Sequence, residues 1–206
     1  MIDSRLKLGW TSIVSGPSCS GKTSFVNELI KNRNSTFNPL SNHVIWFYGE
    51  IEPKDKIPHV KYLKGLPSDD IIIQVKTTIV LDDLFLESGN SSIVTNLFTR
   101  VSHHRECFVI FLTQNMYQKS KDGRSRNLNT HYLILFKNVR DSTIMYSLNK
   151  QMFPCKNDKF LIDIYEHAIS VPYGYLFIDL RSETDDKLRF RSYLFDTNIV
   201  YLREQV

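Results

Sequence analysis

The sequence has few of the features that mark membrane-spanning, secreted or disulfide-stabilised proteins. None of its apolar runs approaches the roughly 18 residues that a membrane-spanning helix needs, which argues against a transmembrane role and a membrane partner. No apolar segment follows the charged residues of the N-terminal MIDSRLKLGW, so we expect no secretory signal and a chain that stays inside a cell. The three cysteines, Cys19, Cys107 and Cys155, are widely spaced, which suits neither a disulfide framework nor a structural zinc site.

The excess of positive over negative charge is also small. Lysine and arginine number 26 against 22 acidic residues, and the resulting net charge of +4 permits contact with a polyanion without identifying one. Hydrophobic residues make up 42% of the chain and charged residues 23%, a balance typical of a folded globular protein. A length of 206 residues suits one domain of ordinary size, so we expect a single domain over residues 1–206.

The sequence does contain a succession of short apolar runs, rich in β-branched and aromatic residues and separated by polar or helical stretches. This alternation predicts an α/β fold with a mostly parallel central sheet flanked by helices. The expected strands are Thr11–Ser15, His43–Tyr48, Thr77–Phe85, Phe108–Thr113 and His131–Phe136. The expected helices are Thr23–Ile30, Ser91–His104, Asp141–Phe153 and Phe160–Ser170.

The last part of the chain predicts a closing antiparallel strand pair, Tyr173–Leu180 and Leu188–Phe195. The acidic stretch Glu183–Asp186 is its expected exposed connection. Two other stretches have little periodicity. Glu50–Asp70 is interrupted by prolines and Lys119–Asn129 is basic, and we expect both to be surface loops.

The strongest motif is Gly16-Pro17-Ser18-Cys19-Ser20-Gly21-Lys22-Thr23. It satisfies the phosphate-binding pattern G-x-x-x-x-G-K-[ST], with a predicted strand before it and a predicted helix after it. In such a loop, backbone N–H groups surround a phosphate chain while the positive end of the helix points inward. We expect Gly16 and Gly21 to allow close approach, Lys22 to neutralise the β- and γ-phosphates, and the Thr23 hydroxyl to hold Mg²⁺. The alternative is a glycine-containing turn that binds nothing.

Two adjacent acids, Asp82 and Asp83, follow the apolar run Ile79-Val80-Leu81. At the end of a buried strand beside the loop, we expect Asp82 to contact Mg²⁺ through its water shell and Asp83 to polarise the attacking water. The pair favours hydrolysis, with helix capping as the alternative.

Gln114 ends the next predicted strand. Because parallel sheets bind ligands at the carboxyl ends of their strands, we expect Gln114 to face the γ-phosphate. Its amide can donate to the phosphate, accept from the water and so report whether the nucleotide is intact. An ordinary polar strand end is the alternative.

Taken in order, five segments resemble the DNA packaging ATPases of Polinton/Maverick elements and adintoviruses, relatives of the poxvirus and giant-virus packaging ATPases in the FtsK/HerA superfamily. These segments are GPSCSGKT, IVLDDLF, SHHRECFVIFLTQNMY, NLNTHYLILFKNVRD and YGYLFIDL. The resemblance extends from about Ser12 to about Phe195. It implies a P-loop NTPase and a homo-oligomeric ring that hydrolyses ATP to thread double-stranded DNA into a capsid. Capsid proteins and an intracellular site of virion assembly follow from the same resemblance.

The resemblance also implies residue roles. Gly21, Lys22 and Thr23 correspond to the Walker A motif, Asp82 and Asp83 to the Walker B motif, and Gln114 to the sensor position. The wider superfamily commonly has Glu after the Walker B Asp, whereas this chain has the shorter Asp83.

Charge that develops on the transferred phosphoryl group is often met by an arginine from a neighbouring subunit. We expect Arg105, near the rim of the site, to fill this role, and Arg126 is the second choice. Each could instead be an ordinary surface residue. The basic residues expected to line a DNA channel are Lys119, Lys121, Arg124 and Arg126.

Four further residues favour structural roles. His103 and His104 lack flanking third and fourth zinc ligands, so we expect them to pack at a helix end. Cys19 is expected to be a small neutral filler of the loop. Trp10 could touch the adenine or belong to the core, and we favour the core.

Two other functions remain open besides the packaging motor. A nucleoside or nucleotide kinase is one, because GPSxSGKT also resembles the guanylate kinase loop. It would need an acceptor-base pocket and an arginine-bearing lid, for which Lys119–Asn129 could serve. The other is a nucleotide-binding scaffold that recruits a capsid or membrane partner without turnover, against which Lys22, Thr23 and Asp82 count.

Overall fold

The computed structural model describes most of the chain. The described residues are 5–7, 9–67, 75–82, 84, 92–116, 121–140, 143–154, 158–195 and 198–203. The predictions made for Asp83, Lys119 and Cys155 lie outside these residues, and the side chain of Lys121 is also not described. Within this part of the chain, no helix has the length and apolar character needed to cross a bilayer.

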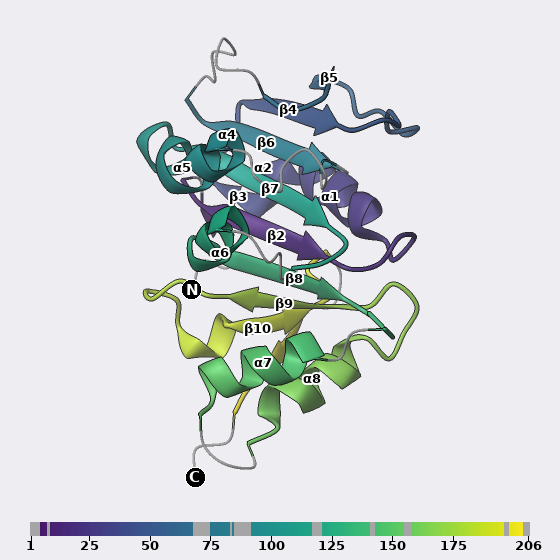
Figure 1. Cartoon of the computed structure of the whole chain (residues 1–206), viewed down its shortest axis with the longest axis vertical. Coiled ribbons are helices and arrows are strands. Elements are labelled where there is room, and N and C mark those ends of the chain that lie inside the picture. Colours follow the sequence, from purple (N-terminus) through teal and green to yellow (C-terminus); the bar gives the residue numbers. More distant parts are fainter. Residues whose placement is uncertain are drawn as a thin grey trace.

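One large sheet dominates the molecule (Figure 1). Within the described residues its nine strands follow the order β11-β10-β9-β8-β2-β7-β6-β4-β5. The strands are β2 (Thr11–Ser15), β4 (His43–Tyr48), β5 (Val60–Lys64), β6 (Thr77–Asp82), β7 (Phe108–Thr113), β8 (Tyr132–Phe136), β9 (Tyr175–Asp179), β10 (Phe190–Ser192) and β11 (Ile199–Tyr201). A separate parallel pair joins β1 (Leu6–Lys7) to β3 (Phe37–Asn38).

Pairing divides the sheet into a parallel part and an antiparallel part. From β5 to β8 every neighbouring pair is parallel, so the carboxyl ends of these strands meet at one edge. From β8 to β11 the pairing is antiparallel. The predicted α/β fold, with a mostly parallel sheet, flanking helices and a C-terminal antiparallel group, is therefore confirmed.

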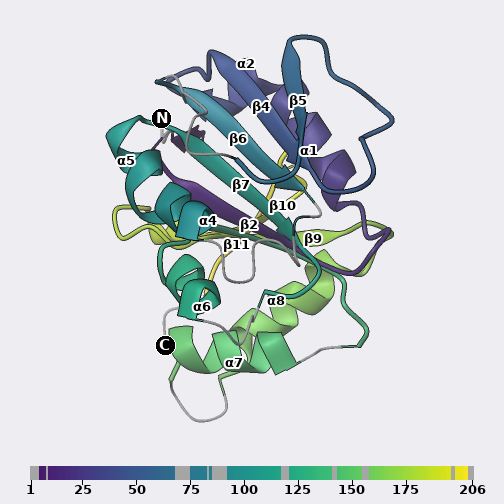
Figure 2. The ribbon, with the colours of Figure 1, turned by 45° about the horizontal axis from the view of Figure 1, so that its top comes forward.

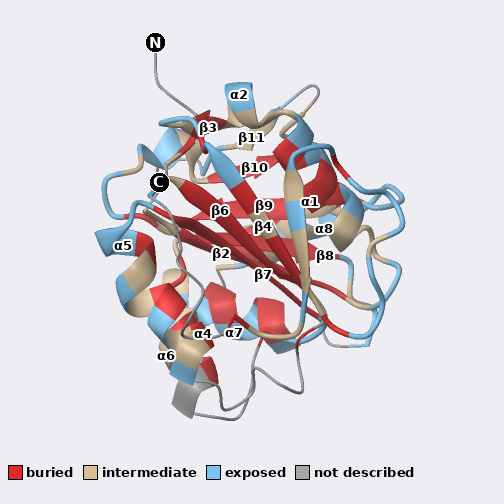
Figure 3. Ribbon diagram, turned by 90° about the horizontal axis from the view of Figure 1, so that it is seen from above, coloured by how far each residue is buried: buried red, intermediate tan, exposed pale blue. Residues whose placement is uncertain are grey.

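The central strands are apolar on both faces, which is why their sequences lack polar alternation. Successive residues of β6 illustrate this, because Ile79 and Leu81 belong to one hydrophobic cluster and Val80 to the other. Figure 3 shows the buried strands running through the middle of the molecule. Two cores, one on each face, hold the sheet between its helices.

Helices cover both faces of the sheet (Figures 1 and 2). On one face lie α1 (Lys22–Lys31) and the short α2 (Arg33–Thr36). The other face carries α4 (Ser92–Asn96), the π-helical turn η1 (Leu97–Val101), α5 (Ser102–His104), α6 (Lys121–Leu128), α7 (Thr143–Met152) and α8 (Phe160–Ala168). A 3₁₀ turn, η2, spans Asp186–Leu188.

Two stretches predicted as loops contain regular structure, so those predictions are wrong in part. Glu50–Asp70 includes β5, an edge strand with no buried residue and hence little hydrophobic pattern. Lys119–Asn129 includes α6, whose sequence KDGRSRNL has no apolar stripe to announce a helix. The expected antiparallel pair is present as β9 and β10 and is extended by β11.

At the amino-terminal edge of the parallel strands, His131 lies in an aromatic cluster. Its ring centroid is 4.2 Å from that of Trp10, and its Nδ1 atom is 2.9 Å from the Thr11 hydroxyl. Burial, with positive charge from His103 and Arg181, lowers the pKa of His131 from 6.5 to about 4. Trp10 therefore packs at this edge, away from the phosphate-binding loop, in agreement with the core assignment.

We expect acid to destabilise the fold through His131. Because its folded pKa is about 4 against 6.5 in the unfolded chain, unfolding takes up a proton between these values. The contribution of neutral His131 to the free energy of unfolding is fully present above about pH 6.5 and is lost as the pH falls towards 4. At about pH 5 the loss should be about 1–2 kcal/mol, allowing for partial exposure of the ring. Urea unfolding at two pH values, for the parent and His131→Gln, measures it; an equal pH dependence in both would contradict the assignment.

Candidate functional site

The phosphate-binding motif forms a loop that connects β2 to α1 at the carboxyl edge of the sheet (Figure 1). Its beginning is tied to β7, because the Gly16 N–H donates to the Thr113 carbonyl at 3.2 Å. Its middle closes on itself, with Ser20 N–H donating to the Pro17 carbonyl at 3.3 Å. The start of the loop is thus fixed to the end of β7.

The first turn of α1 is suited to an anion. Gly21 stands at its N-cap with φ of 102°, a conformation that side-chain-bearing residues rarely adopt. The cap makes no side-chain hydrogen bond and the first turn contains no acidic residue. The helix N–H groups and the positive end of the helix dipole therefore point into the loop with no internal competitor.

Lys22 adds a full positive charge to the loop. Its Nζ atom donates to the carbonyl oxygens of Gly16 and Pro17, at 2.8 Å each. The hydroxyl of Ser20 is buried and has no hydrogen-bond partner among the described residues. A phosphate chain seated in the loop would supply acceptors to both groups.

A cavity of about 310 Å³ joins this loop to the ends of the neighbouring strands. It is lined by Ser18, Cys19, Lys22, Thr23, Ile51, Glu52, Pro53, Lys54, Asp82, Leu112, Thr113 and Gln114. Parallel pairing explains this convergence, because β7, which ends before Gln114, lies between β2 and β6, which ends at Asp82. The cavity thus contains Lys22, Thr23, Asp82 and Gln114, four residues named from the sequence as site candidates.

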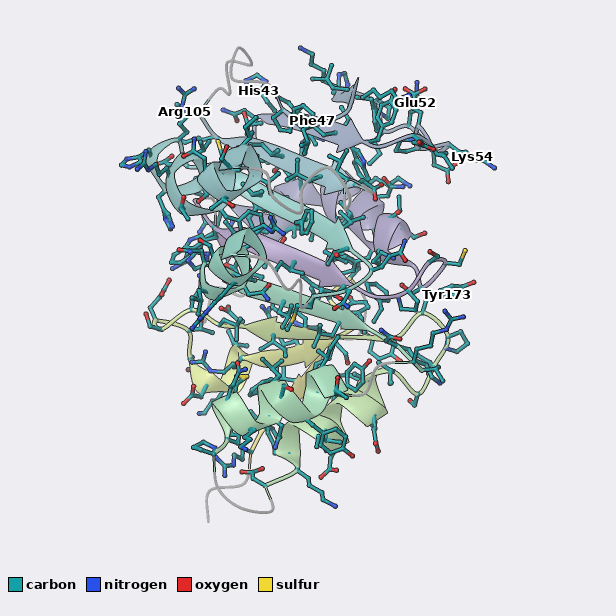
Figure 4. All side chains as sticks on the ribbon, in the orientation of Figure 1. His43, Phe47, Glu52, Lys54, Arg105 and Tyr173 are labelled. Atoms are coloured by element: carbon teal, nitrogen blue, oxygen red, sulfur yellow. The ribbon has the colours of Figure 1, made fainter. Side chains whose placement is uncertain are left out.

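The segment that follows β4 also reaches the cavity, although this was not predicted from its sequence. Glu52 and Lys54 line the cavity, and Figure 4 shows both on the loop beyond that strand. Glu52 also forms an ion pair with Lys56, with 2.8 Å between Oε1 and Nζ. A signal for this placement was present in the sequence. Because β4 was expected to be a parallel strand, the residues that follow it had to lie at the same edge as Asp82.

Thr23 and Asp82 fit a magnesium ion, which prefers oxygen ligands and keeps several waters. One hydroxyl and one carboxylate line the same cavity, and phosphate oxygens would complete such a site. Among the described residues, no group of three or more His, Cys, Asp or Glu could hold a metal ion by itself.

The two arginines favoured from the sequence lie away from this cavity. Arg105 is exposed and precedes β7, at the edge opposite the loop (Figure 4). A six-residue strand separates it from the end of β7, a distance of about 20 Å, so Arg105 does not lie at the rim of its own site. Arg126 is only 2% exposed, and its guanidinium carbon lies 5.3 Å from the centroid of the Phe111 ring.

A larger cavity, of about 1290 Å³, lies elsewhere. Its lining comes from the end of α7, from η2 and from the last two strands, and contains none of the site residues predicted from the sequence. Of these two cavities, the smaller one is lined by the loop, the start of α1 and the strand ends, which are features suited to a phosphate chain.

The sequence matches no protein-family model and no curated protein. Solved structures do resemble its fold. The genome packaging NTPase B204 of Sulfolobus turreted icosahedral virus 2, in complex with ATP-gammaS, matches with a TM-score of 0.54 and 10% identity, over 85% of this chain and 95% of that one. The DNA-packaging ATPase B204 of Sulfolobus turreted icosahedral virus matches with a TM-score of 0.53 and 10% identity, over 87% and 96%. At this identity the likeness demonstrates a shared fold.

We expect Lys22→Ala to weaken binding of Mg²⁺-tripolyphosphate and ATP. A hydrogen bond to a charged group contributes about 1.5–3 kcal/mol, so affinity should fall about 10- to 100-fold. Lys31→Ala is the matched control, since Lys31 is exposed in the last turn of the same helix. Isothermal titration calorimetry measures the affinities. Equal binding by Lys22→Ala and the parent would refute the role of Lys22.

Proposed function

We propose that this chain is an ATP-hydrolysing motor, a single domain over residues 1–206, that moves viral or transposon double-stranded DNA into a capsid. The observation that carries the proposal is the cavity joining Lys22, Thr23, Asp82 and Gln114. The fold likeness to genome packaging NTPases supports it, as does the resemblance of the motifs to Polinton and adintovirus packaging ATPases. Capsid proteins would be its partners at an intracellular site of virion assembly.

The residues of the cavity divide the chemistry between them. The N–H groups at the start of α1 and the Lys22 ammonium hold the β- and γ-phosphates of ATP and stabilise the charge that develops on them. Thr23 and Asp82 hold Mg²⁺, which supplies further charge neutralisation when bound. The Gln114 amide donates to the γ-phosphate and accepts from the attacking water.

Water activation needs a carboxylate beyond Asp82. Asp83 is the first candidate because it follows Asp82 directly in the sequence. Glu52 is a second candidate, because it lines the cavity with Asp82. Its ion pair with Lys56 occupies one oxygen of the Glu52 carboxylate.

The active form is a homo-oligomeric ring in which Arg105 acts on the site of a neighbouring subunit. Arg105 is exposed and lies at the edge of the sheet opposite the loop, so its own site is out of reach. A ring that joins this edge to the carboxyl edge of the next subunit would bring an arginine to each γ-phosphate.

The basic segment around α6 is the proposed DNA contact, but Arg126 is no longer part of it. Arg124 is exposed and can contact a phosphate backbone. Arg126 is buried over Phe111, so it supports the fold and is withdrawn as a DNA-channel residue and as an arginine finger. The same burial removes Arg126, but not the exposed Arg124, from the arginines that a kinase lid could use.

The function is tested by ATP hydrolysis with and without duplex DNA, beside phosphoryl transfer to GMP or thymidine. We expect DNA of any sequence to stimulate hydrolysis, and the stimulation to fall steeply with salt, because backbone contacts release counterions. Arg124→Ala should reduce the stimulation and leave ATP affinity unchanged.

Two outcomes of these assays would contradict the proposal. Transfer to GMP or thymidine would establish the kinase alternative. A monomer in sedimentation with ATP and DNA present would remove the ring, and with it the role of Arg105. In a ring, adding Arg105→Ala subunits to the parent should lower the rate more than in proportion to their share.

We expect Asp83→Asn to bind ATP and hydrolyse it about 10²- to 10⁴-fold more slowly, the usual contribution of a general base. Glu52→Gln is the matched comparison and should leave the rate nearly unchanged, whereas Asp82→Asn should raise the Mg²⁺ concentration needed for half-maximal rate. Single-turnover hydrolysis at several Mg²⁺ concentrations separates the three. A slow Glu52→Gln with a normal Asp83→Asn would transfer the role to Glu52.

A further inference from the structure

An exposed aromatic side chain, Tyr173, lies beside the phosphate-binding loop (Figure 4). It belongs to the turn Val171–Gly174, closed by a hydrogen bond from the Gly174 N–H to the Val171 carbonyl at 3.0 Å. The Tyr173 side chain is 72% exposed. Most of the aromatic residues that the structure describes belong to the two cores or pack against them, whereas the Tyr173 ring faces solvent.

The backbone at Tyr173 is strained. Its φ of +61° is the left-handed conformation that third turn positions usually reserve for glycine or asparagine. The turn cannot easily relax, because Gly174 is packed so closely that an added Cβ would lie 2.3 Å from the Ala168 carbonyl oxygen. Strain that is held in place around an exposed side chain is a feature of ligand-binding positions.

Contact with Gly21 fixes where the ring lies. A Cβ added to Gly21 would be 3.2 Å from Tyr173 Cδ1 and 3.4 Å from Tyr173 Cβ. Two residues later, Tyr175 pairs with Phe136, the last residue of β8. Tyr173 therefore stands at the carboxyl edge of the sheet, on the β8 side of the loop.

This is the side towards which the nucleoside must extend. Asp82 and Gln114 follow β6 and β7, which lie on one side of β2, whereas β8 and β9 lie on the other. A triphosphate whose γ end faces Asp82 and Gln114 directs its nucleoside away from them, across Gly21 towards the turn. Trp10 is excluded as the base contact, because it packs against His131 at the opposite edge.

We propose that the nucleobase of the bound triphosphate stacks on the ring of Tyr173. The inference rests on the proposed function, since it needs a triphosphate in the loop. An aromatic face accepts any base and reads no hydrogen-bond pattern, so this subsite adds affinity with little choice between adenine and guanine. The held backbone conformation presents the ring without a further ordering cost on binding.

The test compares ATP, GTP and inorganic tripolyphosphate by calorimetry with Mg²⁺ present. Tyr173→Ala should lower ATP and GTP affinity about tenfold or more, the scale of base stacking, and leave tripolyphosphate affinity unchanged. Tyr173→Phe should bind all three as the parent does. Tyr146→Ala is the control, since Tyr146 is 60% exposed on α7. Tyr173→Asn, which suits the backbone, should fold at least as stably as the parent and bind ATP as weakly as Tyr173→Ala.

Two results would overturn the inference and spare the proposed function. One is equal weakening of ATP and tripolyphosphate in Tyr173→Ala, which would make the ring a support of the loop. The other is a parent that binds tripolyphosphate as tightly as ATP. A parent that binds neither would overturn the proposed function together with the inference.

Discussion

Parallel pairing of β2 with β7, and of β7 with β6, is the constraint on which the rest of the structure depends. The register runs from Ser15 opposite Thr113 to Leu81 opposite Phe111, so the three strands end at one edge. Each strand is buried on both faces and cannot shift by a residue without exchanging its two hydrophobic surfaces. The cavity exists because three chain segments far apart in sequence are held at this edge by backbone hydrogen bonds.

Packing on one face of the sheet fixes α1 with its amino-terminal end towards the cavity. The apolar side of the helix, through Phe25, Val26, Leu29 and Ile30, joins the cluster that also contains Val14, Val80 and Ile110. With the helix body fixed there, its amino-terminal turn and Lys22 have no freedom to turn away from the loop. The same core that stabilises the fold therefore orients the charge that a phosphate chain would meet.

The direction of a parallel sheet also places two groups of polar residues at opposite edges. Its carboxyl edge carries the loop, Asp82 and Gln114, whereas its amino edge carries Arg105 and the cluster of His131 with Trp10. Residues at the second edge cannot serve the first edge of the same chain. This separation is the physical ground for the proposal that Arg105 acts on a neighbouring subunit, because its place between β6 and β7 in the sequence suggested a closeness that the sheet does not provide.

Local patterns in the sequence determined the phosphate-binding loop, the buried strands and the helices α1, α7 and α8, since each depends on neighbouring residues with helix or strand periodicity. The tertiary structure alone decided the surroundings of the loop. Glu52 reaches it from a segment without informative periodicity, Tyr173 reaches it from a turn just before β9 although a strand was predicted there, and Arg126 lies buried although its sequence neighbours are polar. The reason is that pairing and packing between distant segments set which residues meet, and such contacts have no local signature in a single chain.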